Sequence, residues 1–185
     1  DKRCAYEESM RIPLLAYAPS RIEPGSQSDA LVANIDVAPT FLEWAGLDVP
    51  EQIDGQSLIP LFENPANTDG WRDSLLYEYY WEPSYPMTPT TFALRGGRFK
   101  LIQYHGFWDN DELYDLERDP HEQNNLIGRD DQKERVSTMR RQLYRRLKES
   151  DGLAIPLGFK RNHGTNLRSE QGSNRSEFPP TMIHR

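Results

Sequence analysis

The sequence has little cysteine, no long apolar run and no excess of positive charge. Its single cysteine, Cys4, excludes an internal disulfide framework. No apolar stretch approaches the roughly 18 residues that a membrane-spanning helix needs. The net charge of −7 argues against a nucleic-acid-binding protein that relies on phosphate contacts. What is left is a polar, acidic chain of 185 residues, a length that suits one domain with an appendage.

Residue groups that carry catalysis are also scarce. The chain shows no metal-ligand cluster, no glycine-rich phosphate loop and no nucleophile–base pair. The acidic run DNDE (109–112) fails as an EF-hand calcium loop, because Tyr114 stands where the loop needs glycine. Cys4 has no adjacent base that would activate a thiolate. The residues by themselves therefore assign no reaction.

The first part of the chain alternates short apolar segments with turns. RIPLLAYAP (11–19) is an apolar run closed by proline, which predicts a buried strand followed by a turn. VAPTFLEWAGL (37–47) predicts a helix that Asp36 caps. The apolar face of this helix would consist of Val37, Phe41, Leu42 and Ala45. DGQSLIPLF (54–62) predicts a short helical turn, and the whole pattern is typical of an α/β unit.

From residue 74 the pattern changes to strands. SLLYEYYW (74–81) predicts one strand, and ELYDL (112–116) predicts another. Between them, Gly96 and Gly97 separate two β-rich runs, which predicts a hairpin whose tight turn needs positive φ. Residues 130–150 predict an amphipathic helix. Its apolar stripe would consist of Val136, Met139, Leu143 and Leu147.

These patterns divide the chain into three predicted regions. Residues 1–70 would end an α/β domain, and residues 71–152 would form a small antiparallel sheet with a C-terminal helix. Residues 153–185 are rich in Arg, Asn, Ser and Gly without periodicity, which predicts a disordered tail. The chain opens on Asp1 with no signal peptide, so we expect it to be the back part of a longer protein.

Six segments of the chain are informative when they are taken together and in order. They are DKRCAYEESMRIPLLAYAP, LVANIDVAPTFLEWAGL, DGQSLIPLF, WRDSLLYEYY, RGGRFKLI and ELYDLERDPHEQNNL. In this order they resemble the C-terminal part of the formylglycine-dependent sulfatases, which belong to the alkaline-phosphatase-like superfamily. The resemblance covers residues 1 to about 147. The first two segments are most similar to N-acetylglucosamine-6-sulfatases and related glycan sulfatases. An α/β sulfatase fold is therefore implied.

The resemblance also implies roles for single residues. In this family the lysine of a K-x(4)-E segment contacts the substrate sulfate, and Lys2 with Glu7 occupies that pattern here. A compact ammonium suits this role, because it can neutralise charge that develops on a sulfuryl oxygen. His105 and Trp108 lie in the small C-terminal subdomain, which in such enzymes can close over the sugar. We expect these two residues to contact the substrate.

The family's nucleophile and metal are implied to lie outside this chain. The formylglycine arises from C-x-P-S-R near the start of such enzymes, and the calcium ligands also lie largely upstream. YAPSR (17–21) matches that motif except at Tyr17, which cannot become formylglycine, so we interpret the match as a coincidence. We expect calcium and formylglycine in the intact protein, with no metal ligand and no nucleophile in this chain.

The expected function is hydrolysis of sulfate esters of a sugar or glycan by the whole protein, with the fragment alone inactive. Two alternatives stay open: a phosphodiesterase or phosphonate hydrolase of the same superfamily, and a non-catalytic glycan-binding module. The expected partner is a sulfated sugar or glycan, without nucleic acid and without a membrane span. Many such enzymes are exported, and we expect export here.

Overall fold

The computed structural model describes residues 3–82, 84–107, 110–156 and 175–177. The chain forms two compact units. One unit contains residues 1–12 together with 74–185, and the other contains residues 13–73. The N-terminal residues thus belong to the same unit as the later strands. The division at residues 70 and 152 that the sequence suggests stays a prediction.

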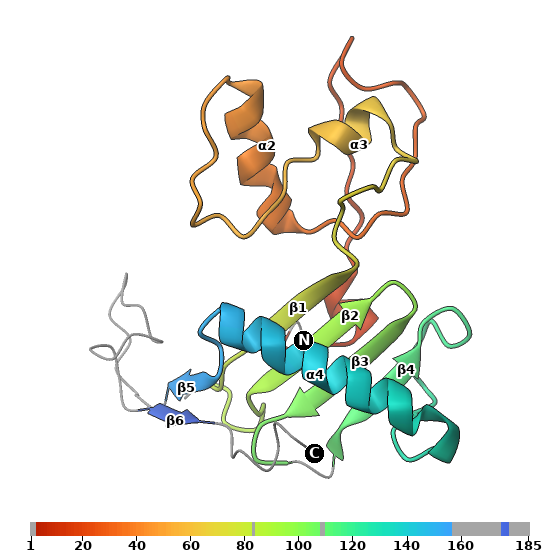
Figure 1. Ribbon diagram of the computed structural model, residues 1–185, viewed down its shortest axis with the longest axis vertical. Helices are drawn as coiled ribbons and strands as arrows, with labels where there is room; N and C mark the ends of the chain where they lie inside the picture. Colours follow the sequence, from red (N-terminus) through yellow and green to blue (C-terminus); the bar gives the residue numbers. More distant parts are fainter. Residues whose placement is uncertain (1–2, 83, 108–109, 157–174, 178–185) are drawn as a thin grey trace. The chain divides into compact units, whose positions relative to one another are not determined.

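The larger unit is built on a four-stranded antiparallel sheet, in which each strand pairs with the next along the chain (Figure 1). The strands are β1 (Ser74–Tyr79), β2 (Thr91–Gly96), β3 (Phe99–Tyr104) and β4 (Glu112–Asp115). The predicted hairpin is present, with Arg95 opposite Lys100. The expectation of a turn with positive φ was wrong, because neither Gly96 nor Gly97 adopts a positive φ.

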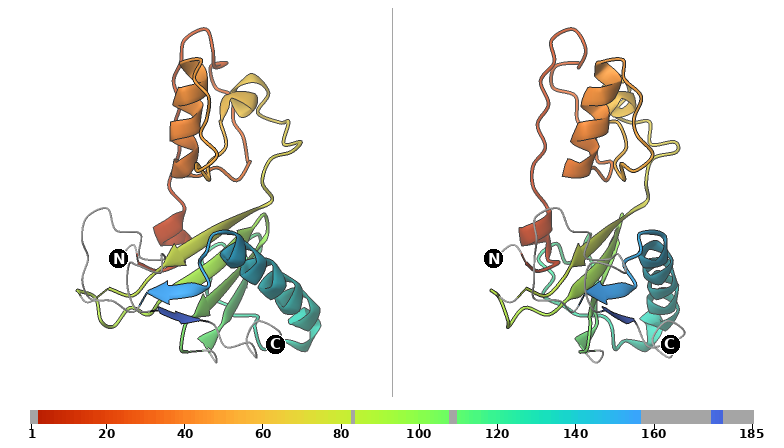
Figure 2. Two further views of the ribbon diagram at one scale, coloured as in Figure 1. Left: turned by 60° about the vertical axis from the view of Figure 1, so that its left-hand side comes forward. Right: turned by 90° about the vertical axis from the view of Figure 1, so that its left-hand side faces the viewer.

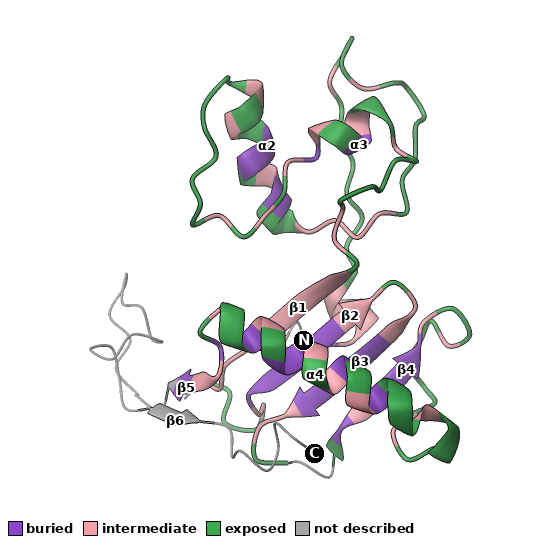
Figure 3. Cartoon of the chain, viewed as in Figure 1, coloured by how far each residue is buried: buried purple, intermediate pink, exposed green. Residues whose placement is uncertain are grey.

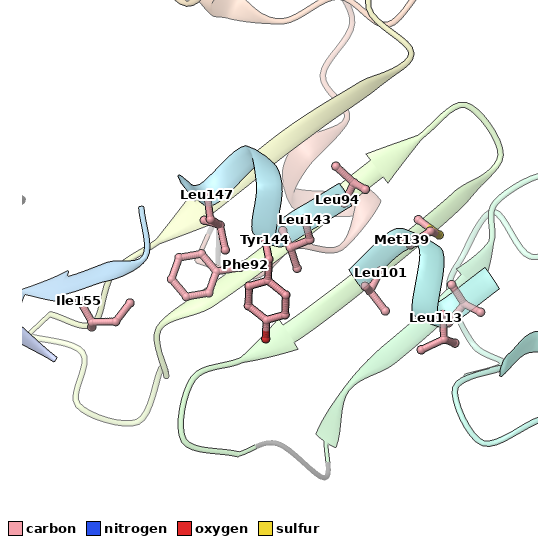
Figure 4. Close-up of a cluster of buried hydrophobic side chains, with 10 residues drawn as sticks. Phe92, Leu94, Leu101, Leu113, Met139, Leu143, Tyr144, Leu147 and Ile155 are labelled. Carbon is pink, nitrogen blue, oxygen red and sulfur yellow. The ribbon is translucent and has the colours of Figure 1, made fainter. Parts of the chain in front are cut away.

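One face of the sheet is covered by the helix α4 (Lys133–Glu149), which runs across the strands (Figure 1). The predicted apolar stripe of this helix is confirmed, and its buried side faces the sheet (Figure 3). The cluster between helix and sheet contains Phe92, Leu94, Leu101, Leu113, Val136, Met139, Leu143, Tyr144, Leu147 and Ile155 (Figure 4). We call this side of the sheet the helix face. Its contacts are almost all apolar, so the hydrophobic effect holds it together.

The opposite side of the sheet carries the residues that alternate with those of the helix face. A second, smaller cluster forms there from Ala5, Ala93, Ile102 and Tyr114. The covering segment is Arg3–Met10, which includes the short helix α1 (Glu7–Met10) (Figure 2). We call this side the segment face. A polypeptide from the start of the chain therefore completes a sheet formed about 70 residues later.

The unit of residues 13–73 contains α2 (Val37–Trp44) and α3 (Ile59–Glu63). Asp36 does not cap α2 through its side chain, contrary to the prediction. Its buried carboxylate instead accepts hydrogen bonds from the backbone N–H groups of Ala33 and Gln56 and pairs with Arg72 at 2.5 Å. The carboxylate thus joins separate parts of this unit, because a buried charge needs several partners to offset its desolvation.

One further expectation for this part of the chain was wrong. Residues 11–18 form no helix or strand, and the side chain of Leu15 is 94% exposed. In the part of the chain that the structure describes, no strand pairs with residues 11–18. A strand without a neighbour would leave its backbone N–H and C=O groups without hydrogen bonds, so this run does not form one. The apolar face predicted for α2 is partly exposed, since Val37 and Leu42 are half-buried and Phe41 is 61% exposed. The residues that α2 buries are Pro39 and Thr40.

The chain after α4 adds a small antiparallel pair of strands, β5 (Ala154–Pro156) and β6 (Arg175–Glu177). These six residues differ from the unstructured tail that the sequence suggests. The fold-class prediction itself is confirmed, because the unit has a small antiparallel sheet with a C-terminal helix. Within the described ranges, no helix is both long and apolar enough to cross a membrane.

Candidate functional site

The candidate site lies where the segment Arg3–Glu7 meets the sheet. Arg3 places its guanidinium over the ring of Tyr85, 3.1 Å from the ring centroid. Ala5 is fully buried against Ala93 and Ile102. Because anchored residues follow one another so closely along the chain, the segment has little conformational freedom.

A cluster of phenols surrounds one carboxylate at this position. Tyr6 donates a hydrogen bond to Glu112 at 2.9 Å, Tyr104 donates at 3.0 Å and Tyr114 donates at 2.8 Å. The hydroxyls of Tyr6 and Tyr104 lie 3.5 Å apart. A carboxylate has about four acceptor positions, so three phenols satisfy most of its capacity. We call these four residues the tyrosine cluster.

The tyrosine cluster is also an electrostatic unit. Burial, together with the nearby Glu112 carboxylate, raises the pKa values of Tyr6, Tyr104 and Tyr114 above the ordinary value. The phenols therefore stay protonated and remain hydrogen-bond donors at physiological pH. Their arrangement keeps the carboxylate fixed in position.

A second group of charges anchors Glu7. The Lys100 ammonium lies 2.9 Å from Glu7 Oε1 and 2.6 Å from Glu122 Oε1. Arg95 approaches the other oxygen of Glu7 at 3.5 Å. Burial acts to raise the pKa of Glu7, but the hydrogen bond and charge of Lys100, with the charge of Arg95, outweigh it and lower that pKa. Burial raises the pKa of Glu122 in spite of Lys100. We call Glu7, Arg95, Lys100 and Glu122 the charge cluster.

A cavity of about 1030 Å³ opens next to the tyrosine cluster. Tyr104 and Glu112 line it, as does His105. Trp81 and Phe107 supply aromatic surface. A concave, largely apolar site with a few polar groups is the usual form of a small-ligand pocket, and a sugar presents both apolar faces and hydroxyls to such a lining.

His105 follows the last residue of β3, and its backbone N–H donates to the Thr90 carbonyl at 2.9 Å. This bond fixes the point where the chain leaves the sheet. Burial lowers the pKa of the His105 imidazole below the ordinary value. The neutral ring is therefore favoured at physiological pH, and a neutral imidazole has one donor and one acceptor nitrogen.

The structure describes two of the four site residues predicted from the sequence. Glu7 and His105 are described, whereas Lys2 and Trp108 lie outside the described residues. The structure brings the segment of Glu7 close to the strand of His105, because Tyr6 and Tyr104 share the Glu112 carboxylate. The roles of all four residues stay predictions.

Sequence reasoning missed Glu112, Lys100 and Glu122 as members of the site. The alternation in RFKLIQY (98–104) could have placed Lys100 and Tyr104 on one sheet face. Glu112 belongs to the acidic run that fails as a calcium loop and to the predicted strand ELYDL, and neither pattern indicates a cluster of phenols. No signal in the sequence indicated that Glu122 would meet Lys100.

The acidic residues that the structure describes do not fit a calcium site. Glu112 is occupied by phenols, and Asp111 accepts hydrogen bonds from Gln103 at 2.6 Å and Arg140 at 2.9 Å. No group of three or more His, Cys, Asp or Glu side chains in the described parts of the chain is arranged to hold a metal ion. The implied calcium therefore has no ligand set among these residues.

The fold and this site can now be compared with known proteins. Residues 1–149 match the family described as N-sulphoglucosamine sulphohydrolase, C-terminal. This match covers well over half of the chain, so the chain belongs to that family of sulfatase C-terminal regions. The family resemblance inferred from the six segments is confirmed.

Individual relatives of the chain are also named as sulfatases. An N-acetylglucosamine-6-O-sulfatase of Bacteroides thetaiotaomicron is 42% identical over 130 residues, covering 70% of this chain and 23% of the relative. An N-acetylglucosamine-6-sulfatase of Bos taurus is 34% identical over 155 residues, covering 68% of this chain and 27% of the relative. The chain thus spans about a quarter of the length of these curated relatives.

Solved structures agree on the fold. One, described as a complex with its substrate D-glucosamine-2-N,6-O-disulfate, has a TM-score of 0.66 and 35% identity, covering 72% of this chain and 27% of that one. A phosphonate monoester hydrolase from Silicibacter pomeroyi has a TM-score of 0.61 and 21% identity, covering 87% of this chain and 32% of that one. The second likeness shows the shared fold alone.

Proposed function

We propose that this chain is the C-terminal part of an enzyme that hydrolyses the sulfate ester of a sugar or glycan, with 6-sulfated N-acetylglucosamine as the substrate class. The observation that carries the proposal is the junction of the segment Arg3–Glu7 with the strand of His105 through the tyrosine cluster. It joins the two parts of the chain for which the sequence predicts substrate contact. The relatives named as N-acetylglucosamine-6-sulfatases support the choice of sugar.

The proposed roles follow from the chemistry of each side chain. Lys2 contacts the sulfate and stabilises the negative charge that develops on its oxygens during hydrolysis. His105 and Trp108 contact the sugar, the first through hydrogen bonds of a neutral imidazole and the second through its apolar ring. Glu112 accepts hydrogen bonds from three phenols and so holds Tyr104 in the wall of the same cavity.

The nucleophile and the calcium of the family belong to the rest of the proposed enzyme. Hydrated formylglycine would attack the sulfur, and no residue described here replaces it. This chain contributes contacts to the sulfate and to the sugar. Export of the whole protein is also part of the proposal, and fractionation of the producing cells would test it.

The test is a kinetic comparison in the full-length protein that contains this chain. We expect sulfate release from 6-sulfated N-acetylglucosamine, and we expect Lys2→Ala to lower kcat/KM by about 10²–10³-fold, the usual effect of losing one transition-state contact. Lys148→Ala is the matched control, because Lys148 is an exposed cation on α4. It should leave kcat/KM unchanged.

The same assay separates the alternatives. Preferred turnover of a phosphonate monoester or a phosphodiester would favour the other hydrolases of the superfamily. Binding of sulfated sugar without turnover, and without sensitivity to Lys2→Ala, would favour a glycan-binding module. Either result would overturn the proposed function.

A further inference from the structure

Lys100 occupies an unusual position for a lysine. It lies within β3 on the segment face, and its side chain has no exposed surface. Lysine is almost never fully buried unless it is paired, because the removal of an ammonium from water is costly. Its partners therefore explain why this residue can be accommodated.

Those partners come from two other parts of the chain. The ammonium pairs with Glu7 at 2.9 Å and with Glu122 at 2.6 Å. Glu122 also accepts a hydrogen bond from the backbone N–H of Glu7 at 2.5 Å, across a separation of 115 residues. Glu7 is thus held through both its side chain and its backbone.

The backbone conformation of Glu122 also indicates that this residue is held in a fixed position. This residue has a φ of 52° although it is not glycine. The left-handed region costs a non-glycine residue about 1–2 kcal/mol, and it persists only where surrounding contacts over-determine it. At Glu122 those contacts are a backbone hydrogen bond to the Asp119 carbonyl at 3.1 Å and the side-chain contacts to Lys100 and Glu7.

Stability alone is a weak explanation for this network. A buried ion pair is often no more stabilising than apolar residues of similar volume, because desolvation offsets the attraction. Ile102, two residues further along the same face, shows that apolar side chains fit there. What an apolar pair would lose is the fixed position of Glu7, since apolar contacts are not directional.

We propose that Lys100 and Glu122 are positioning residues, which fix the segment Arg3–Glu7 on the sheet so that Lys2 is held against the substrate sulfate. The inference rests on the proposed function, because that proposal assigns Lys2 its contact with the sulfate. It adds two residues that do not touch the substrate and that act through the segment. Neither belongs to the cavity lining.

The first test measures the segment directly by hydrogen exchange in the full-length protein. We expect Lys100→Met to raise exchange of the amides of residues 3–10 by about tenfold or more beyond its effect on the amides of β2, because local opening has its own free energy. If Lys100→Met does not fold, the double variant Lys100→Met, Glu122→Met replaces it. That variant removes the anchor without leaving the Glu122 carboxylate buried and unpaired, while Glu7 keeps Arg95 at 3.5 Å. Met139→Ala, on the helix face, is the control and should leave residues 3–10 protected.

The second test is a double-mutant cycle on kcat/KM for 6-sulfated N-acetylglucosamine. If Lys100 acts through Lys2, Lys100→Met should lower kcat by about tenfold or more in the unmutated background. In the Lys2→Ala background the same substitution should lower kcat little further, because the effects of coupled residues are not additive. A role in stability alone would lower kcat equally in both backgrounds. Lys100→Arg, which keeps a cation at this position, should recover part of the lost kcat.

The outcomes separate the two proposals. Faster exchange in residues 3–10 with a non-additive cycle supports both. Faster exchange in a protein whose unmutated form has no sulfatase activity supports the anchor and overturns the proposed function. Unchanged exchange in residues 3–10, or a fully additive cycle, overturns the positioning role.

Discussion

The two faces of the same sheet are built on different physical principles. The helix face is sealed by α4 through apolar side chains such as Leu101 and Leu143. The segment face is sealed by Arg3–Met10 through charges and phenols, with only a small apolar cluster around Ala5. Apolar contacts give stability without fixed geometry, whereas hydrogen bonds and ion pairs fix geometry at a desolvation cost. The contrast indicates that the helix face maintains the fold and the segment face positions the candidate site.

The largest expected effect comes from breaking the charge cluster on one side only. Lys100→Met leaves Glu122 buried without its cation and should destabilise the unit by about 3–5 kcal/mol. Native-state hydrogen exchange of the β3 amides measures this loss. Lys100→Met with Glu122→Met should recover most of it. A double variant as unstable as the single one would mean that unpaired charge is not the cause.

Loss of apolar volume on the helix face should destabilise the fold without changing the candidate site. Leu143 is fully buried, and Leu143→Ala should cost about 2–5 kcal/mol through lost transfer energy and a cavity. Thermal denaturation measures the loss, and kcat/KM well below the melting temperature should stay unchanged. A fall in kcat/KM at that temperature would contradict the separation of the two faces.

Removal of one phenol from the tyrosine cluster should have a smaller effect. Tyr104→Phe removes one of three donors to Glu112, and the two remaining donors limit the cost to about 1 kcal/mol. Chemical denaturation measures it against Tyr17→Phe, in which the altered side chain is 91% exposed. An equal effect of both substitutions would mean that the cluster contributes no stability.

The smallest expected effect is a pH dependence at His105. Its pKa is lowered by burial, so the unfolded chain binds the proton more readily than the folded one. Stability should therefore decrease as pH falls below the ordinary histidine pKa of about 6.5, by less than about 1.4 kcal/mol for each pH unit. Melting temperatures between about pH 7.5 and 5.5 measure it. His105→Gln should reduce the slope. Equal slopes in the unmutated protein and in His105→Gln would contradict the assignment.

The same contrast explains how much the sequence could predict. The stripe of α4 was predictable, because Val136, Met139, Leu143 and Leu147 recur at helical spacing. The hairpin between β2 and β3 was predictable from the break at its two glycines, although its backbone conformation was not. A helix stripe and a hairpin turn depend on residues that are close together in the sequence, so the sequence alone can indicate them.

The segment face could not be predicted in the same way. Its contacts join Glu7 to Lys100 and Glu122, residues that lie about a hundred positions apart, and no local pattern encodes such a pairing. The failure at residues 11–18 has a related cause, because an apolar run forms a strand only where another strand pairs with it. The family resemblance indicated Glu7 and His105, but not the residues that hold them.

The most direct test compares a variant in the cavity lining with a variant on the helix face, both in the full-length protein. Kinetics of sulfate release from 6-sulfated N-acetylglucosamine are measured beside thermal denaturation for His105→Gln and Met139→Ala. We predict that His105→Gln lowers kcat/KM with little change in melting temperature, and that Met139→Ala lowers the melting temperature with kcat/KM unchanged. If kcat/KM simply follows the melting temperature in both variants, the cavity lining and the helix face do not differ in function and the account is wrong.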